Sequence, residues 1–394
     1  MIVLNQLALL TKNLSLEVVY WNSNSLMESR MNSAGNEEVS CFVIGNYGDF
    51  NIGDETLLKQ VIKEISNSSH ARFKFYVPAR DVGFVKTYHE ELLGQITPIY
   101  IKNFKKILTS LASSKIIVVG GGGIWSGDTG FFAHFVPFIS ILGKLLIKKV
   151  IFKSIGLYST ASTLDRFFVN LSIVFADKCS VRDNESYQML WQLNRNNKAT
   201  RTDDLSLPFI KSIDEGQDTL LPNIKEYEKV RLLKDQGKLI VGISLKPMKD
   251  SLINKKIVGE FSNALNTLSK RYEHGIHFLF FPFAKTPPKT DEEFIQSVIN
   301  NLRDKDDATI VSHTNPIAWY KAIKELTDVF IGMRYHSIIF SFKAGKPVLS
   351  IPYERKVVEF LKDYSRTNCI AVFPSQVNES NIVDFIQRHS FVPS

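Results

Sequence analysis

The sequence predicts an α/β protein built from two doubly wound domains that face a cleft. A chain of 394 residues exceeds the size at which a single hydrophobic core stops growing. Short apolar runs alternate with amphipathic helical segments in two successive series, and an irregular stretch separates the series. Hydrophobic residues make up 44% of the chain, which is enough to bury a core in each domain.

The first series opens with a strand over residues 41–45, which ends in glycine and leads to an amphipathic helix over 56–65. The run 115–120 is continuously apolar, as strands of a buried parallel sheet are. Its other predicted strands are 73–77, 98–101, 150–155 and 178–181, and its other helices are 81–89, 104–113, 131–146, 164–175 and 185–193.

The second series begins with the strand 239–244 and the helix 258–271. Its other predicted strands are 277–281, 309–312, 328–332 and 347–351, and its other helices are 292–302, 317–326 and 336–344. We therefore predict a partly irregular leader (1–40), an N-terminal domain (41–205), an interdomain connection (206–238), a C-terminal domain (239–375) and a C-terminal helix or tail (376–394).

The net charge of +8 would attract nucleic acid, an anionic membrane or a small anionic substrate. The basic residues are scattered and no nucleic-acid module is recognisable, so we expect no nucleic-acid partner. Three widely spaced cysteines favour a reducing, cytoplasmic setting. No apolar run reaches the roughly 18 residues that span a bilayer. The sequence does not indicate an oligomeric state.

Loops that follow parallel strands are the natural ligand sites. The first, residues 45–54, is rich in glycine and precedes a helix N-terminus. Its carboxylates would repel an anion, so we expect Asn51 and Asp54 to bind sugar hydroxyls, with Asp54 also suited to cap the helix. The alternative is a glycine-rich turn with no ligand.

The second loop holds four glycines after the strand 115–120. Because consecutive glycines cost conformational entropy, we expect Gly121, Gly122 and Gly123 to allow a ligand or another backbone to come close. A tight turn is the alternative. Trp125 could stack on a sugar, although a core or rim position is as consistent with the pattern.

The third loop, residues 332–336, places Arg334 and His336 at the end of a strand. Arginine matches carboxylate and phosphate groups, and histidine titrates near neutral pH, so this pair can bind an anion and move a proton. The alternative is a hydrogen-bonded histidine beside a surface ion pair. Arg182, next to Asp183 after another strand, fits either a second anion contact or a structural ion pair.

Metal-ligand spacings such as HExxH or paired Cys/His clusters are absent from the sequence, so we expect no metal and no cofactor. The nearest carboxylate pair, Asp203 and Asp204, is better explained as part of a loop.

The segments 48–55, 119–123, 180–183 and 332–337, together with 345–348 and 353–356, resemble the polysaccharide pyruvyl transferase family in order and spacing. The resemblance implies two Rossmann-like domains similar to B-type (GT-B) glycosyltransferases and phosphoenolpyruvate as the donor. It implies that Arg334 binds the donor carboxylate or phosphate, that His336 is the general acid, and that Arg182 is a second anion contact. Lys356 and the glycines 121–123 would line the donor site, and such a basic site would account for part of the net charge.

The implied reaction moves pyruvate onto a sugar diol as a ketal. Protonation of the methylene carbon of phosphoenolpyruvate makes the adjacent carbon electrophilic, one hydroxyl attacks as phosphate leaves, and a second closes the ketal. The acceptor would be a sugar, an oligosaccharide or a lipid-linked saccharide. A lipid-linked acceptor would bring the protein to the inner face of the membrane, with lysine groups at 102–106 and 144–149 as candidate contacts. Solvated helix faces are the alternative.

Two other functions remain open from the sequence. A GT-B glycosyltransferase would use a nucleotide sugar in the same cleft, and a nucleotide-reading pocket in the C-terminal domain would favour it. A catalytically silent carbohydrate-binding or scaffold protein is disfavoured by Arg334 together with His336.

Overall fold

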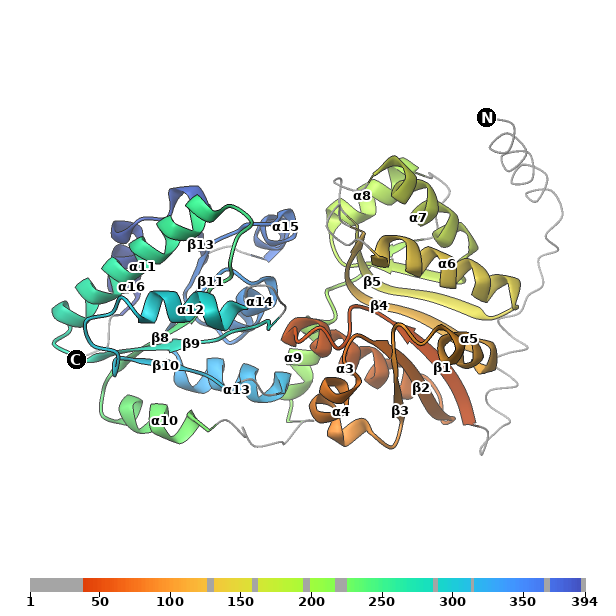
Figure 1. Cartoon of the computed structure of the whole chain (residues 1–394), viewed down its shortest axis with the longest axis horizontal. Helices are drawn as coiled ribbons and strands as arrows, with labels where there is room; N and C mark the ends of the chain where they lie inside the picture. Colours follow the sequence, from red (N-terminus) through yellow and green to blue (C-terminus); the bar gives the residue numbers. More distant parts are fainter. Residues whose placement is uncertain are drawn as a thin grey trace.

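The computed structural model contains two parallel β-sheets with helices on their faces (Figure 1). It describes residues 38–125, 131–157, 162–193, 199–216, 225–285, 290–312, 315–364 and 369–390. Most of the predicted leader and the last residues of the predicted tail lie outside these ranges. The first strand starts at Glu38, inside the predicted leader.

The first sheet has seven parallel strands within the described residues, in the order β3-β2-β1-β4-β5-β6-β7. They are β1 Glu38–Ile44, β2 Arg72–Ala79, β3 Ile96–Tyr100, β4 Ile116–Trp125, β5 Lys149–Leu157, β6 Lys178–Val181 and β7 Thr200–Arg201. The order reverses between β1 and β4, which opens a crevice at their carboxyl ends, as in a Rossmann fold.

The second sheet repeats this arrangement. Its six described strands are all parallel and run in the order β10-β9-β8-β11-β12-β13. They are β8 Leu239–Ser244, β9 Ile276–Phe280, β10 Ala308–Ile310, β11 Val329–Gly332, β12 Val348–Ser350 and β13 Cys369–Ala371. The order here reverses between β8 and β11.

Two helical layers cover the first sheet. Helices α3 (Ile52–Ser66) and α4 (Val82–Tyr88) pack on one face. The other face carries α5 (Phe104–Ser113), α6 (Phe131–Leu145), α7 (Thr163–Phe175) and α8 (Asn184–Leu193). Around the second sheet lie α11 Ser251–Arg271, α12 Asp291–Ile299, α13 Pro316–Leu326, α14 Tyr335–Lys343, α15 Arg355–Tyr364 and α16 Glu379–His389. Of the described helices, none has both the length and the apolar character needed to cross a membrane.

The segment between the sheets contains α9 (Ser206–Asp214) and α10 (Tyr227–Asp235), where the sequence predicted an irregular connection. Helix α9 is short, but its apolar side chains are buried between the two halves of the molecule. Phe209 and Ile210 share one hydrophobic cluster with Ile52 of α3 and Ile338 of α14. The connection therefore forms part of the interdomain core.

The glycine-rich loops differ from their predicted form in two ways. Helix α3 begins at Ile52, and its N-cap is Asn51, whose side-chain oxygen accepts a hydrogen bond from the Gly53 N–H at 3.0 Å. The predicted capping role of Asp54 is therefore wrong, because Asp54 lies inside the first turn. Strand β4 also continues through the glycines to Trp125, with left-handed backbone at Gly121 and Gly122 (φ 61° and 85°).

Helix α3 explains part of the glycine run in β4. A Cβ atom on Gly120 would lie 2.7 Å from Val61, and one on Gly121 would lie 2.9 Å from Leu57. Real Cβ atoms do not approach that closely, so the two glycines let the helix pack directly against the strand. At both positions the close neighbour is a side chain of α3.

Substitution of Gly121 should therefore destabilise the protein. Gly121→Ala adds a methyl group against Leu57 and forces a left-handed backbone on alanine, so we expect a loss of about 1–3 kcal/mol in the free energy of unfolding. The control is Gly259→Ala, because Gly259 lies within α11 with nothing near its Cβ position. That change should stabilise by roughly 0.5–1 kcal/mol. Urea unfolding measures both, and equal effects would contradict the packing argument.

Candidate active site

A short main-chain bridge joins the two halves of the molecule beside the predicted site. Asn51, just before α3, forms an antiparallel β-bridge with Ala284, which lies between β9 and α12. The Ile52 N–H donates to the Phe283 carbonyl, and the Lys285 N–H donates to the Phe50 carbonyl, both at 3.0 Å. The loop after β1 is thereby fixed against the second sheet.

His336, the second residue of α14, lies at this junction. A Cβ atom on Gly53 would stand 1.8 Å from its Nδ1 atom, so the imidazole packs directly on the backbone of α3. Its Nε2 atom is buried and has no hydrogen-bond partner among the described residues. Burial lowers the pKa of His336 to about 4. The ring is therefore neutral at pH 7 in the free protein.

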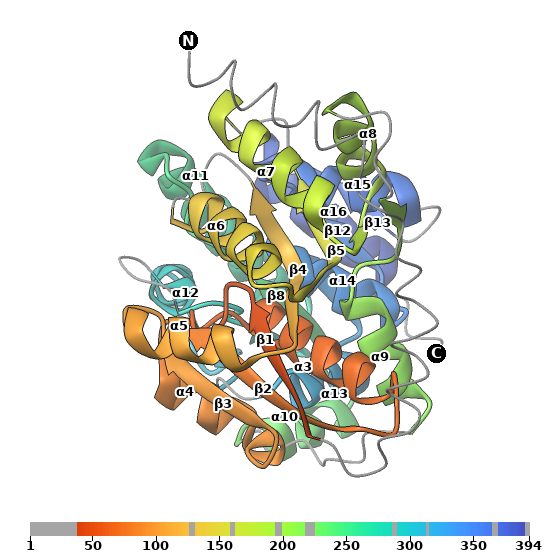
Figure 2. The same ribbon diagram turned by 90° about the vertical axis from the view of Figure 1, so that its right-hand side faces the viewer.

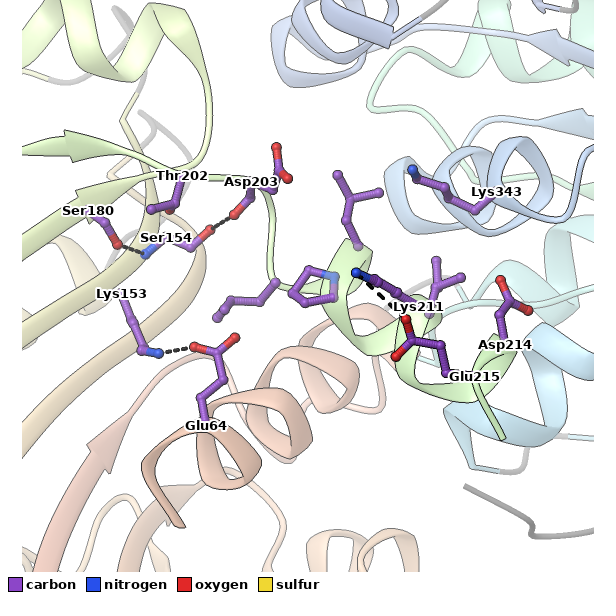
Figure 3. Close-up of a pocket in the computed structure, with 14 residues that line it drawn as sticks. Glu64, Lys153, Ser154, Ser180, Thr202, Asp203, Lys211, Asp214, Glu215 and Lys343 are labelled. Carbon is purple, nitrogen blue, oxygen red and sulfur yellow. Dashed lines mark hydrogen bonds and ion pairs between the residues drawn. The ribbon is translucent and has the colours of Figure 1, made fainter. Parts of the chain in front are cut away.

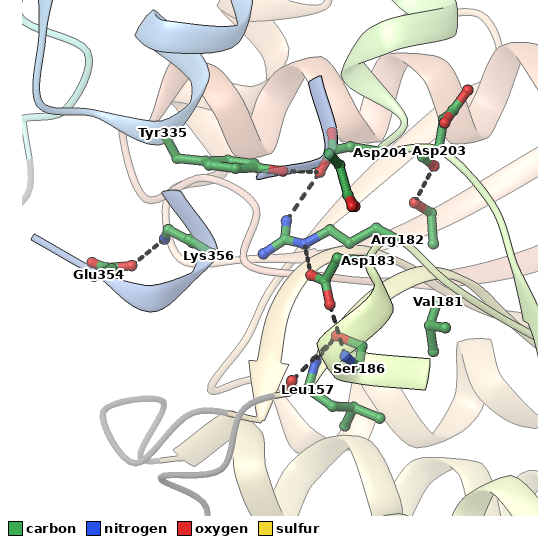
Figure 4. Close-up of polar contacts among 12 residues, drawn as sticks. Leu157, Val181, Arg182, Asp183, Ser186, Asp203, Asp204, Tyr335, Glu354 and Lys356 are labelled. Atoms are coloured by element: carbon green, nitrogen blue, oxygen red, sulfur yellow. Dashed lines mark hydrogen bonds and ion pairs between the residues drawn. The ribbon is translucent and has the colours of Figure 1, made fainter. Parts of the chain in front are cut away.

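Arg182 follows β6, is buried, and acts electrostatically on His336. Figure 4 shows it between Asp183 and Asp204. Its Nη1 atom donates to Asp204 Oδ2 at 3.1 Å, and its guanidinium lies over the ring of Tyr335, 4.9 Å from the centroid. Burial alone would raise the pKa of Asp204, but Arg182 and the neighbouring groups hold it below its usual range. The sequence left two roles open for Arg182, and the structure shows one of them, a structural ion pair, here with Asp204. The other role, contact with a bound anion, stays a prediction.

Arg334 makes a two-bond ion pair with Asp291, the first residue of α12. Its Nε and Nη2 atoms donate to the two carboxylate oxygens at 2.8 and 2.5 Å. Asp291 is fully buried and also accepts the Ala284 N–H at 2.9 Å. Burial opposes the charge of Arg334, but Asp291 holds its pKa above the usual range. The pair uses two of the five N–H groups of a guanidinium.

Two lysines lie close to Arg334 and His336. Lys356, on α15, bonds Glu354 at 2.5 Å, and Lys246, two residues after β8, lies 3.5 Å from the other Glu354 oxygen. The Lys246 ammonium also stands 3.9 Å from the ring centroid of Tyr353. Burial lowers the pKa of Lys246 to about 8, and the charge of Arg334 acts in the same direction. Burial would raise the pKa of Glu354, but the two ammonium groups lower it to about 2.

The loop after β1 adds a carboxylate to the site. Asp54 Oδ2 accepts hydrogen bonds from the side chains of Asn46 at 2.9 Å and Asn51 at 3.0 Å. Its Oδ1 atom lies toward Gly122, 3.7 Å from where a Cβ would be. Burial raises the pKa of Asp54 to about 6, against the opposing influence of Asn46 and Lys356. A group with this pKa can take up a proton near neutral pH.

A buried pair beneath the loop holds it in place. Glu55 accepts the Gly48 N–H at 2.8 Å with one oxygen, and His89 Nε2 lies 2.8 Å from the other. Both side chains are fully buried. The loop backbone is therefore attached to α3 and to the residue that follows α4.

The family model for polysaccharide pyruvyl transferase matches residues 51–355 of the chain. This chain belongs to the polysaccharide pyruvyl transferase family. A comparison with curated proteins found no match.

Solved structures share the fold of this pyruvyl transferase family member at low sequence identity. The UDP-GlcNAc 2-epimerase from Methanocaldococcus jannaschii is 11% identical, covers 91% of this chain and 94% of its own, and has a TM-score of 0.59. The UDP-GlcNAc 2-epimerase from Neisseria meningitidis, bound to UDP-GlcNAc, is 14% identical, covers 89% and 91%, and also has a TM-score of 0.59. The predicted fold, two Rossmann-like doubly wound domains of the GT-B type facing a cleft, is confirmed.

Most of the residues that the sequence suggested for a pyruvyl transferase site meet at this junction. His336 lies within electrostatic reach of Arg182 and Lys356, and Lys356 also influences Asp54. Gly122 borders Asp54, whereas Gly121 packs on α3 and Gly123 pairs with β5. Trp125 is the last residue of β4, and the structure describes its backbone but not its side chain. Its predicted contact with a sugar therefore stays a prediction.

Three further residues belong to this site without having been predicted from the sequence: Lys246, Glu354 and Asp291. Lys246 follows the first strand of the second sheet, so the rule that selected Arg334 would also have found it. Asp291 carried no such signal. It opens a helix more than forty residues before Arg334, and only the folded chain shows that they pair.

Two cavities adjoin this region. One of about 640 Å³ lies between the halves, lined by residues that include Lys153, Asp203 and Lys343 (Figure 3). None of the predicted site residues whose side chains are described lines it. Asp203 lines the cavity, whereas its neighbour Asp204 pairs with Arg182. The other, of about 510 Å³, includes Tyr353 and Glu354 in its wall.

One group of metal-ligating side chains occurs among the described residues, away from this junction. Ligand atoms of His274, Asp304 and Asp307 lie within 4.8 Å of one another. The ammonium of Lys238 stands 3.9 Å from Asp307 and competes with a cation for that carboxylate.

Removal of Asp291 should be costly. Asp291→Ala leaves the charge of Arg334 without its buried partner, so we expect the free energy of unfolding to fall by about 3 kcal/mol. The control, Glu215→Gln, removes the partner of Lys211 in an exposed pair and should change stability by less than about 0.5 kcal/mol. Urea unfolding measures both variants. A loss for Asp291→Ala as small as that of the control would show that the pair does not stabilise the junction.

Proposed function

We propose that this protein transfers pyruvate from phosphoenolpyruvate to a saccharide diol and forms a ketal. Membership of the polysaccharide pyruvyl transferase family supports a transferase with a saccharide acceptor. The observation that carries the proposal is the gathering of Arg182 and Lys356 near an imidazole whose Nε2 atom has no described partner, with Lys246 held next to Lys356 by their shared partner Glu354. A small polyanion that must be protonated on carbon fits this set of groups.

The donor presents a carboxylate and a phosphate, and the cations supply charge for both. The positive charges of Arg182 and Lys356 both act on the pKa of His336. The charge of Arg334 likewise lowers the pKa of Lys246. Cations held in place before the reaction stabilise the negative charge that grows on the departing phosphate. Arg334 keeps N–H groups beyond those bound to Asp291, so it can contact the donor without breaking that pair.

His336 acts as the general acid once the donor is bound. In the free protein its imidazole is neutral at pH 7, because burial lowers its pKa to about 4. A bound anion favours the charged form and raises the pKa, so the ring takes up a proton together with the donor. The imidazolium then delivers that proton to the methylene carbon of phosphoenolpyruvate.

Asp54 serves the acceptor. Its Oδ2 atom is held by Asn46 and Asn51, which leaves Oδ1 to accept a hydrogen bond from the attacking hydroxyl. Attack forms a carbon–oxygen bond at the adjacent carbon, the bond to phosphate breaks with its electron pair, and the second hydroxyl closes the ketal. Of the two hydroxyl protons, one restores His336 and the other leaves on inorganic phosphate, so the reaction balances without a metal or cofactor.

A nucleotide-sugar enzyme is the second candidate. The fold matches an epimerase bound to UDP-GlcNAc, and a nucleotide diphosphate would also be attracted by the lysines. The two candidates differ in which ligand binds, and a binding experiment separates them.

The first test is calorimetric titration of the purified protein with phosphoenolpyruvate and with a panel of nucleotide sugars. We expect saturable phosphoenolpyruvate binding that is unchanged by chelator or magnesium. Lys356→Met should weaken it at least tenfold, since a hydrogen bond between charged groups contributes about 1.5–3 kcal/mol. Lys362→Met, on the exposed side of the same helix, is the control. Binding of a nucleotide sugar alone would overturn the proposal.

Proton uptake tests the role of His336. Repeating the titration at pH 7 in two buffers of different ionisation enthalpy gives the number of protons bound with the donor. We expect wild type to take up more protons than His336→Asn, by up to about one, and its affinity to rise as the pH falls. Asp54→Asn, which removes the carboxyl whose pKa burial raises to about 6, should retain the His336 contribution. Equal uptake in wild type and His336→Asn would exclude His336 as the group that is charged on binding.

A further inference from the structure

The helical layer formed by α5, α6 and α7 has an unusual outer surface. Figure 2 views this layer from the side on which the three helices face the reader. Leu145 at the end of α6 is 76% exposed, and Ile147 in the following turn is 92% exposed. The other exposed apolar side chains of this layer are Phe104, Leu108, Phe138, Leu146, Leu164, Phe167, Val174 and Phe175. We call this surface the α5–α7 face.

The exposed side chains form stripes. On α7, Leu164, Phe167 and Val174 lie on the outer side, while Val169 and Ile173 are buried against the sheet. The same holds on α6, where Phe138 and Leu145 are seven positions apart and Val136 is buried. A surface helix of a water-soluble protein normally carries polar residues opposite its buried side. Exposed apolar side chains gathered on one side of a molecule mark a contact with a protein or a membrane.

The charges around the α5–α7 face favour the membrane. Its described segments, 102–115, 131–149 and 162–178, contain nine lysines and arginines and only two acids, Asp165 and Asp177. Asp177 is already bonded to Lys144 at 3.0 Å, and Asp165 accepts the Ser162 hydroxyl at 2.7 Å. These segments therefore carry a net positive charge, and Lys105 and Lys106 on α5 are among their exposed lysines. Apolar side chains bordered by lysines are the pattern of helices that lie in a lipid interface.

We propose that the α5–α7 face docks on the surface of an anionic lipid bilayer. The apolar side chains enter the boundary between headgroups and acyl chains, and the lysines contact anionic headgroups. Helices α6 and α7 follow the carboxyl ends of β4 and β5, the edge of the sheet that also carries Arg182. If the proposed function holds, a saccharide linked to a lipid in that bilayer reaches the site from the side on which it is anchored.

Vesicle co-sedimentation of the full chain tests the docking. We expect binding to phosphatidylcholine vesicles containing about 30 mol % phosphatidylglycerol, and at least tenfold weaker binding to phosphatidylcholine alone or at high salt. The double variant Phe138→Ser/Phe167→Ser should weaken binding at least tenfold, because it removes apolar side chains from the interface. The matched control is Leu252→Ser/Phe373→Ser, which changes two exposed apolar side chains elsewhere. Thermal melting verifies that both variants fold.

The charge contribution is tested separately with Lys105→Gln/Lys106→Gln, which should weaken binding to the anionic vesicles roughly 30-fold. Absence of binding to anionic vesicles, or equal binding by wild type and the Phe138→Ser/Phe167→Ser variant, would overturn the proposal. Light scattering that shows an oligomer dispersed by the same variant would instead identify a second copy as the occupant. Phosphoenolpyruvate binding should be unchanged in all these variants. Failure of the membrane proposal can therefore be distinguished from failure of the enzymatic proposal.

Discussion

The buried carboxylate of Asp291 is the constraint on which the junction depends. This carboxylate accepts the Ala284 N–H, which fixes the segment that pairs with residues 50–52. It also accepts two N–H groups of Arg334, which fixes the start of α14. The imidazole of His336 then meets the backbone of Gly53. Groups carried by two separate sheets therefore depend for their placement on one buried side chain.

The charges of the molecule are divided in a way that composition does not reveal. Arg182 and Arg334 each pair with a carboxylate, and Lys246 and Lys356 share Glu354. The site is therefore nearly balanced in the free protein, contrary to the expectation that a basic site accounts for part of the net charge. Unbalanced lysines lie instead on the outer helices of the first sheet.

Strand and helix alternation predicted the fold because parallel strands in a covered sheet must be apolar throughout, which leaves a strong pattern in the sequence. The rule that ligands bind at strand carboxyl ends also selected His336, Arg182 and Asp54. Pairings between distant segments, such as Arg334 with Asp291, leave no periodic signal. Likewise, Gly121 was expected to let a ligand or another backbone come close, and the structure places Leu57 of α3 there; the sequence could not distinguish these cases, whereas the packing distance does.

The position of Glu354 bears on how a catalytic cycle would end. Its carboxylate bridges two ammonium groups that are proposed to hold the donor, so an arriving anion must displace it. After transfer, the same carboxylate competes with inorganic phosphate for those ammonium groups at very high local concentration. A tethered competitor of this kind would shorten the residence time of the product and make the enzyme insensitive to phosphate in its surroundings.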